Sequence, residues 1–479
     1  MNWLVEANAC PGLFYGTAAQ DGFLIRLRTP GGWLNSPQGK AIATWLEQLQ
    51  TTIQVTNRAN LQIRGLQKSP SLEEFQTLQK LGLAAHNPSI DHLRNIMSSP
   101  TAGIDCQESI DTRPLVQELD NFIQNYPSIA ELSPKFSIGI DGGGAVGIGT
   151  GSTMAWQHRY NEIQLSAIAV NNPTNLTSLV CFRLALAGDK QLYDTDLLIE
   201  PENCLAVVKA LVKVYVDYVQ QNPNIKGKKP RMKHLLKDWG LAKYLEQVNS
   251  QLHRTSTGII HRQKYRQAAH STQPYFHLGI HPQKQPGLSY IGLSLRLGQL
   301  TANQLSGLAA LSETFGSGQL RLTPWQTVIL PDIPDEKVSE LLPKLASLGL
   351  SASLGWDAGI VACSGKPGCA AAATATQIHA SLLADYLKER LTCNSPVNIH
   401  LTGCAKSCAQ PGPAEITLLG TTIEENGQIL EAYQVYVGDS QKFLETPIFE
   451  GEFAKIPPLI AQILSSQKSK NLDEQNGIH

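Results

Sequence analysis

Two segments of the chain repeat the same order of strand, helix and strand, and this duplication limits the possible folds more than any other feature. The first copy lies within residues 23–64 and the second within residues 290–330. Each copy has an apolar strand, an amphipathic helix and a second strand in which apolar positions alternate. Thr301 is the predicted N-cap of the second helix, and Asn35 or Ser36 is that of the first.

A second, fainter repeat relates residues 135–169 to residues 397–420. The later copy carries cysteines where the earlier copy carries glycines, so we expect one metal cluster rather than two. Together the repeats predict a tandem duplication with a pseudo-twofold axis and a ligand site between the halves. The polar segment 220–230, which contains Pro and Gly, is the predicted start of the linker between them.

Four cysteines near the C-terminal end form two short pairs, Cys363 with Cys369 and Cys404 with Cys408. A cubane 4Fe–4S cluster needs thiolates that converge on one small volume, and two pairs on neighbouring loops supply them. The alternatives are a zinc site and buried thiols without a metal. Zinc pairs are usually closer in sequence than the first pair, so the spacing favours the 4Fe–4S cluster.

Residues 370–391, which follow Cys369, have the pattern of a helix. A helix that begins beside a cluster of net negative charge stabilises it through backbone N–H groups and the helix dipole. An ordinary core helix is an equally compatible interpretation. Its predicted apolar stripe consists of Ile378, Leu382, Leu383, Tyr386 and Leu387.

Composition restricts the class of protein further. The cysteine total of nine is odd and the other five are scattered, which favours a reducing compartment over a disulfide framework. The 39 Lys and Arg residues balance 40 Asp and Glu residues, so no overall field favours nucleic acid. No apolar stretch reaches membrane-spanning length, and the first residues show no leader pattern. We therefore expect a cytoplasmic protein that binds neither nucleic acid nor a membrane.

The motifs resemble those of the sirohaem nitrite and sulfite reductase superfamily. The cysteine pairs, the duplication and residues 56–64 (TNRANLQIR) carry this resemblance. Within the superfamily the chain looks most like the precorrin-3B synthases. The strings that discriminate are ACPGL at 9–13, CSGKPGC at 363–369, TGCAKSCA at 402–409 and LRLTPW at 320–325.

The resemblance implies an α+β fold of the nitrite/sulfite reductase type, with two ferredoxin-like half-domains and two α/β sirohaem-type domains related by pseudo-twofold symmetry. We place the half-domains at 1–82 and 275–348, the α/β domain without cluster cysteines at 83–219, and the cluster-binding α/β domain at 349–465. A linker with a helix at 220–274 and a polar tail at 466–479 complete the chain.

The resemblance also implies an activity. Precorrin-3B synthases are monooxygenases of aerobic cobalamin biosynthesis that convert precorrin-3A to precorrin-3B by hydroxylation and lactone formation. The implied reactants are the tetrapyrrole precorrin-3A and dioxygen. The implied cofactors are a 4Fe–4S cluster and a mononuclear non-haem iron, with NADH as the indirect electron source through a separate electron-donor protein. A sirohaem-dependent nitrite or sulfite reductase is the alternative, and a non-catalytic iron–sulfur carrier is the third interpretation.

Sulfite reductases hold their anion with two arginines and two lysines. Arg28 and Arg94 resemble the two arginines and Lys135 resembles the first lysine, but Ser137 stands where the second lysine is expected. A small anion that takes up many electrons needs dense positive charge. The missing cation is therefore an argument against anion reduction and for a tetrapyrrole substrate.

A row of polar residues follows the predicted strand Thr52–Arg64. Alternate residues of a strand face one side, so the row would form a comb of donors for tetrapyrrole carboxylates. A solvent-facing polar strand is the simpler interpretation. The residues of the row are Arg58, Asn60, Gln62 and Arg64.

The glycine-rich segment Gly142–Gly147 satisfies a dinucleotide fingerprint but is predicted not to bind NADH, since no helix pattern follows it. Several histidines are candidate ligands of a non-haem iron, but no spacing singles one out.

Overall fold

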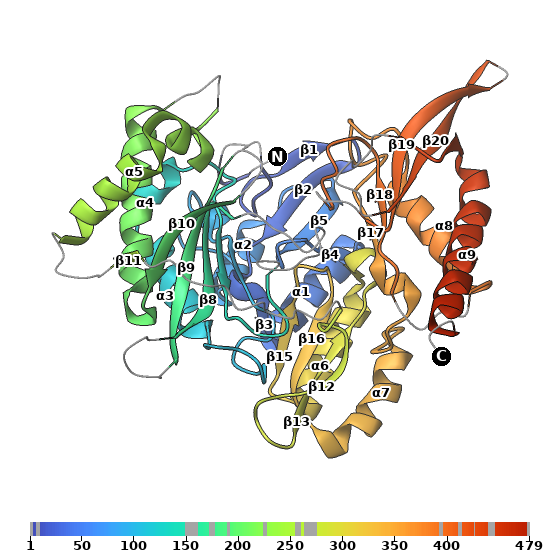
Figure 1. Cartoon of the computed structure of the whole chain (residues 1–479), viewed down its shortest axis with the longest axis horizontal. Coiled ribbons are helices and arrows are strands. Elements are labelled where there is room, and N and C mark those ends of the chain that lie inside the picture. The colour runs from blue at the N-terminus through green and yellow to red at the C-terminus, as the bar shows by residue number, and fades with distance from the viewer. Residues whose placement is uncertain are drawn as a thin grey trace.

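The computed structural model describes most of the chain and shows its elements in layers around a central region (Figure 1). The described residues are 3–5, 10–148, 161–171, 178–188, 192–223, 228–253, 260–262, 275–391, 396–410, 414–425, 427–438 and 446–476. Residues 224–227, 254–259 and 263–274 of the predicted linker lie outside them. In the described part of the chain, no helix is long and apolar enough to cross a membrane.

The two repeats of strand, helix and strand form two five-stranded sheets that exchange an edge strand. The first sheet has the order β1–β2–β5–β4–β14 and the second β12–β13–β16–β15–β3, so each takes its last strand from the other half. The strands of the first are Thr17–Ala19, Gly22–Leu27, Leu61–Leu66, Ile53–Val55 and Gln299–Leu300. Those of the second are Gly279–Pro282, Leu288–Leu293, Val328–Pro334, Gln319–Leu322 and Trp33–Asn35.

The helices of the two repeats, α1 (Ser36–Leu49) and α6 (Ala302–Phe315), pack against each other in one apolar core. Both begin with a capping box, in which Asn35 or Thr301 exchanges hydrogen bonds with a Gln three residues later. The predicted N-caps Asn35 and Thr301 are therefore confirmed. Two shorter helices, α2 (Leu72–Lys80) and α7 (Val338–Ser347), cover the same apolar core.

The first α/β unit is a six-stranded sheet with the order β11–β10–β9–β8–β7–β6. Strands β6 to β8 are parallel neighbours and the rest are antiparallel. Helices α3, α4 and α5 belong to its core. The strands in this order are Ile260–Arg262, Leu192–Ile199, Ser178–Ala187, Ile163–Asn171, Ile138–Asp141 and Ile96–Ser98, and the helices are Arg113–Gln124, Cys204–Gln221 and Met232–His253.

The second α/β unit repeats this plan with the strand order β17–β18–β19–β20–β21, and its α8 and α9 lie at the end of the molecule opposite α5 (Figure 1). The hairpin β19–β20 extends beyond the body of the molecule. The strands are Ile360–Ala362, Ile399–Thr402, Ile416–Glu425, Gln428–Val437 and Phe449–Glu452, and the helices are Thr376–Lys388 and Ile456–Asn476.

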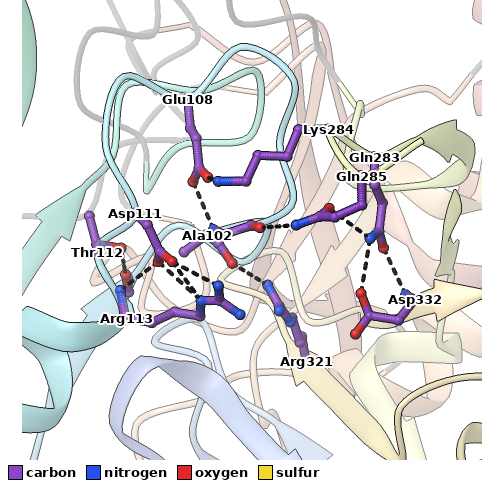
Figure 2. Close-up of polar contacts among 12 residues, drawn as sticks. Ala102, Glu108, Asp111, Thr112, Arg113, Gln283, Lys284, Gln285, Arg321 and Asp332 are labelled. Carbon is purple, nitrogen blue, oxygen red and sulfur yellow. Dashed lines mark hydrogen bonds and ion pairs between the residues drawn. The ribbon is translucent and has the colours of Figure 1, made fainter. Parts of the chain in front are cut away.

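Polar contacts fix the first α/β unit against the second ferredoxin-like sheet (Figure 2). Arg321, on β15, is fully buried and donates to the backbone carbonyls of Pro100 and Ala102 at 3.1 and 2.6 Å. Nearby, Lys284 pairs with Glu108. These contacts cross between the two halves of the chain, so the duplicated halves form one body.

Two local predictions are wrong. Residues 52–64 form a hairpin rather than one strand, because the chain turns between Val55 and Leu61. Helix α8 begins at Thr376, and Ile378 and Leu382 of its predicted buried stripe are 56% and 52% exposed.

Candidate functional site

The hairpin β4–β5 is the element around which the site is built. In its turn, the hydroxyl of Thr56 accepts hydrogen bonds from the backbone N–H groups of Arg58 and Asn60 at 3.3 and 3.1 Å. Ala59 has a φ of 53°, which reverses the chain between the strands. The turn therefore presents Arg58 on a short, well-tied loop.

Four arginines gather around this hairpin, and we call Arg26, Arg28, Arg58 and Arg64 the arginine cluster. Burial, followed by the charges of Arg28, Arg58 and Arg64, lowers the pKa of Arg26 to about 9. Burial, followed by the charges of Arg28 and Arg231, lowers the pKa of Arg58 to about 10. These like charges therefore lie close enough to repel one another in a region that water does not screen.

The arginine cluster is short of counter-charge. Arg64 forms an ion pair with Asp21 at 3.1 Å. Among the described residues, Arg26 and Arg28 form no ion pair, and their Nε atoms are buried without a hydrogen-bond partner. Buried guanidinium groups without an anion are costly, so the arrangement is suited to a bound anionic group.

The four cysteines lie on two loops that follow β17 and β18. Burial, followed by the charges of Cys404, Cys363 and Cys369, raises the pKa of Cys408, so the other three thiols lie within electrostatic range of Cys408. The backbone N–H of Gly403 donates to the sulfur of Cys363 at 3.2 Å. Gly365 has a φ of 60°, and a Cβ there would lie 2.4 Å from the backbone nitrogen of Thr376, so the first loop requires glycine. We call Cys363, Cys369, Cys404 and Cys408 the cysteine quartet.

The quartet does not have the geometry of a single-ion site. In the part of the chain that the structure describes, no three His, Cys, Asp or Glu side chains are placed to hold one metal ion. A cubane cluster instead has one iron at each thiolate, so its sulfurs surround a larger body. The same finding leaves the predicted mononuclear non-haem iron without a ligand set among the described residues.

The hairpin contacts both cysteine loops and so joins the arginine cluster to the quartet. The amide of Asn57 donates to the carbonyl of Cys408 at 3.2 Å. The guanidinium of Arg64 donates to the carbonyl of Gly368 at 2.6 Å and to the hydroxyl of Ser364 at 3.3 Å. A ligand on the arginine cluster would therefore lie next to the quartet.

On its other side the hairpin reaches the first α/β unit. Arg58 donates to the hydroxyl of Ser137 at 3.1 Å and to the amide oxygen of Asn161 at 2.5 Å. Positive charge is thus present at the position where the sequence has Ser137 instead of a lysine. The argument that Ser137 leaves the site without a cation is therefore wrong.

The predicted anion residues do not all meet. Arg28 is buried in the arginine cluster. Arg94 forms a bidentate ion pair with Asp120, with hydrogen bonds of 2.8 and 2.9 Å. Burial lowers the pKa of Arg94, but the hydrogen bonds and charge of Asp120 outweigh this effect, so the pKa is raised. Lys135 is exposed. The structure therefore brings together Arg28 and the hairpin arginines, with Arg94 in a separate ion pair.

The amides of the predicted comb contact the protein itself. Asn60 accepts from the backbone N–H of Thr29 at 3.1 Å and donates to Asn95 at 3.0 Å. Gln62 accepts from Arg26 at 2.6 Å. These side chains position the arginines, and Gln62 and Arg64 alone of the four predicted comb residues lie on β5.

Sequence reasoning missed Asn57 and Asn161 as parts of the site and did not assign Arg26 to it. The density of arginines near Arg26 and Arg28 is the signal that identifies Arg26. Asn57 and Asn161 have no such signal, because their contacts join segments far apart in the chain.

The glycine-rich segment after β7 uses its backbone N–H groups internally. The carboxylate of Asp141 accepts from the N–H groups of Gly143 and Ile148 at 2.9 and 3.1 Å. In a dinucleotide fingerprint such groups bind a pyrophosphate. No finding supports NADH as a ligand of this chain.

Family models match the two ferredoxin-like halves and the first α/β unit. The model of the nitrite/sulfite reductase ferredoxin-like half domain matches residues 17–76 and 281–348. That of the nitrite and sulphite reductase 4Fe-4S domain matches residues 89–255. This second match covers the first α/β unit, which has no quartet cysteines. The quartet belongs to the second α/β unit.

Curated relatives match over most of their length. The ferredoxin–nitrite reductase of Synechococcus elongatus is 30% identical over 439 residues, which cover 89% of this chain and 82% of the relative. That of Leptolyngbya laminosa is 31% identical over 446 residues, with the same shares covered. The solved structure of the Mycobacterium tuberculosis NirA protein has a TM-score of 0.75 at 23% identity, covering 92% of this chain and 80% of that one, which shows a common fold.

The chain therefore belongs to the nitrite and sulfite reductase family, whose members are oxidoreductases. The predicted fold, with two ferredoxin-like halves and two α/β units, is confirmed.

The prediction of a precorrin-3B synthase is wrong, because these relatives are named ferredoxin–nitrite reductases. No support remains for a monooxygenase, for precorrin-3A and dioxygen as reactants, or for a place in cobalamin biosynthesis. Clustered thiols and arginines suit any protein that holds an iron–sulfur cluster beside a carboxylate-rich macrocycle, so these motifs do not separate the two activities.

Proposed function

We propose that this protein reduces nitrite to ammonium, with a sirohaem and a 4Fe–4S cluster as cofactors and a separate protein such as ferredoxin as electron donor. The observation that carries the proposal is the hairpin β4–β5, which joins the arginine cluster to the cysteine quartet. The relatives named ferredoxin–nitrite reductase support the substrate and the donor.

The arginine cluster suits sirohaem, a macrocycle that carries many carboxylates. The buried Nε–H groups of Arg26 and Arg28 lack a partner among the described residues, and a carboxylate would supply it. Arginine binds carboxylates through two parallel hydrogen bonds, so the cluster would also orient the ring.

The cysteine quartet suits a 4Fe–4S cluster. Each thiol would bind one iron, and the N–H of Gly403 would remain donated to the sulfur of Cys363. The carbonyl of Cys408 accepts a hydrogen bond from Asn57, so Cys408 lies next to the hairpin β4–β5. We therefore assign Cys408 to the side of the quartet that faces the macrocycle.

The reaction consumes one nitrite, six electrons and eight protons and gives one ammonium and two waters. When bound, the sirohaem supplies the iron to which nitrite binds, and the cluster supplies electrons one at a time. Arg28 and Arg58 would attract the anion and hold its negative charge in a region of low dielectric constant. Ser137 and Asn161 would keep Arg58 in position for this role.

The test is the oxidation of reduced methyl viologen by the anaerobically purified protein with nitrite or sulfite as acceptor. We expect nitrite to be reduced to ammonium and to be the better substrate by kcat/KM. We expect Arg28→Gln to lower kcat/KM for nitrite by about tenfold to a hundredfold. A protein that holds both cofactors but does not consume nitrite would refute the proposal.

A further inference from the structure

We infer that a groove beside α8 is the docking site for the electron-donor protein. The α8 groove has a volume of about 510 Å³, which is in the range of small-molecule binding sites, and one wall is α8 itself. The opposite wall comes from the second ferredoxin-like half and its exchanged strand β14. The residues used below are Arg296, Gln299, Gln377, Ile378 and Leu382.

The apolar surface of α8 is the first argument. Ile378 and Leu382 are one helical turn apart and are 56% and 52% exposed. The core side of the helix is filled by other residues, Ala380, Leu383 and Leu387, which are fully buried. Among the described residues, α8 is the only helix with two large apolar side chains that are more than half exposed. Exposed apolar patches of this kind mark interaction surfaces.

The second argument is the short path from the groove to the quartet. The amide of Gln377, in the groove wall, donates to the carbonyl of Cys363 at 2.9 Å and to that of Ala362 at 3.0 Å. The hydroxyl of the preceding residue, Thr376, lies 3.4 Å from the sulfur of Cys363. A protein in the groove would therefore stand within a few side-chain contacts of the thiolates.

The third argument identifies the kind of partner, and it rests on the proposed function. Arg296 is the one charged residue among the described residues of the groove lining, and it pairs with Asp385 on α8. Apart from this exposed ion pair the described lining is uncharged, and the cores of protein interfaces are likewise depleted of charged residues. The groove fits a small iron–sulfur electron carrier that presents apolar residues around its own cluster. Interfaces of electron carriers are small and transient, so two exposed apolar residues can supply their apolar contact area.

Each encounter would transfer one electron. The carrier's cluster loses one electron and the cluster on the quartet gains it. No bond forms or breaks and no proton is transferred. The groove is needed only for this step, so a small diffusible reductant should bypass it.

The experiment compares two reductants for the holoenzyme: a reduced plant-type 2Fe–2S ferredoxin and reduced methyl viologen. In the double variant Ile378→Asp with Leu382→Asp, we expect the KM for ferredoxin to rise about tenfold or more. The rate with methyl viologen should stay within about twofold of the unchanged protein. The matched control is Ile429→Asp, since Ile429 is 78% exposed at the far end of the hairpin β19–β20. This control should change neither rate.

Three results would overturn the inference. The first is an unchanged KM for ferredoxin in the double variant, and the second is an equal loss of rate with ferredoxin and with methyl viologen. The third is a dimer that the unchanged protein forms without ferredoxin and that dissociates in the double variant. The third would mean that a second copy of the chain occupies the groove.

A different result would refute the proposed function, namely that the protein reduces no nitrite with methyl viologen as electron donor. The groove is then still testable, by following the bleaching of the quartet's cluster when reduced ferredoxin is mixed with the protein. Bleaching that is slowed in the double variant supports the groove, and an equal rate refutes it.

Discussion

Two of the side chains that define the site, Arg26 and Arg28, form no ion pair with any described residue, whereas Arg64 is paired with Asp21. Arg26 and Arg28 lie among other arginines, and their Nε atoms have no partner among the described residues. Such positions destabilise the chain without its cofactor, because an unpaired buried charge is expensive. The unpaired arginines therefore lower the stability of the cofactor-free protein and raise its affinity for an anionic group.

The first prediction concerns Arg26. Arg26→Gln should raise the free energy of unfolding of the cofactor-free protein by roughly 1–2 kcal/mol, because it removes one of several repelling buried charges. The same variant should retain less sirohaem after purification. Chemical denaturation of the cofactor-free protein and acid–acetone extraction of the holoenzyme measure the two effects. Arg390→Gln, at an exposed residue just beyond the end of α8, is the control, and a destabilised Arg26→Gln variant would contradict the account.

The second prediction concerns the quartet. Cys408→Ser should abolish the cluster, because a cubane cluster needs four thiolates. Iron and acid-labile sulfide counts measure this loss, and circular dichroism checks that the chain stays folded. Cys106→Ser, at an exposed cysteine outside the quartet, should keep full iron and sulfide content. A Cys408→Ser variant with an intact cluster would remove Cys408 from the ligand set.

The third prediction concerns pH. Burial, followed by the charges of Arg28 and Lys229, lowers the pKa of His92 to about 3. His92 is then neutral in the folded protein but becomes protonated in the unfolded chain below about pH 6.5. The free energy of unfolding should therefore fall by about 1.4 kcal/mol per pH unit between about pH 6 and pH 4 because of this residue.

His92→Asn should remove this slope, and the exposed His86→Asn should leave it unchanged. Denaturant unfolding at several pH values measures the difference. Equal slopes in the His92→Asn variant and the unchanged protein would show that His92 is protonated in the folded state.

At the scale of the elements, the repeated strand, helix and strand are predictable from apolar periodicity, and their N-caps Asn35 and Thr301 from residue type. The turn in residues 52–64 is not, because Ala59 adopts a left-handed φ that its residue type does not announce. The exposed Ile378 and Leu382 were also predicted as core. Periodicity marks apolar residues on a helix, but it cannot say whether a partner protein or the core covers them.

The fourth prediction tests the strand exchange. Gly32, which precedes the exchanged strand β3, has a φ of 78°, and a Cβ there would lie 2.6 Å from the carbonyl oxygen of Leu322. Gly32→Ala should lower the free energy of unfolding by roughly 2–4 kcal/mol, from backbone strain and from the displaced strand β15.

Gly427→Ala is the control for Gly32→Ala. Gly427 has a φ of 77° but no atom within 4 Å of the added Cβ, so only the strain remains, at about 1–2 kcal/mol. Thermal or denaturant unfolding compares the two variants. Equal losses would mean that Leu322 moves aside without cost.

At the scale of the whole molecule, the duplication and the single set of cluster cysteines predict the fold correctly. The sequence does not predict the exchanged edge strands β3 and β14, since they pair across more than two hundred residues. Nor does it separate the activities of the superfamily. The serine at position 137, where a lysine is expected, is an argument against anion reduction, but Arg58 donates to Ser137 from another part of the chain and supplies positive charge there.

The central claim is that the arginine cluster and the cysteine quartet hold a sirohaem and a 4Fe–4S cluster side by side. The most direct test is to purify the protein without oxygen, extract it with acid–acetone, and count sirohaem, non-haem iron and acid-labile sulfide per chain. We predict one sirohaem with four non-haem irons and four sulfides, the composition of one cubane cluster. An iron–sulfur cluster without any extractable tetrapyrrole would contradict the claim.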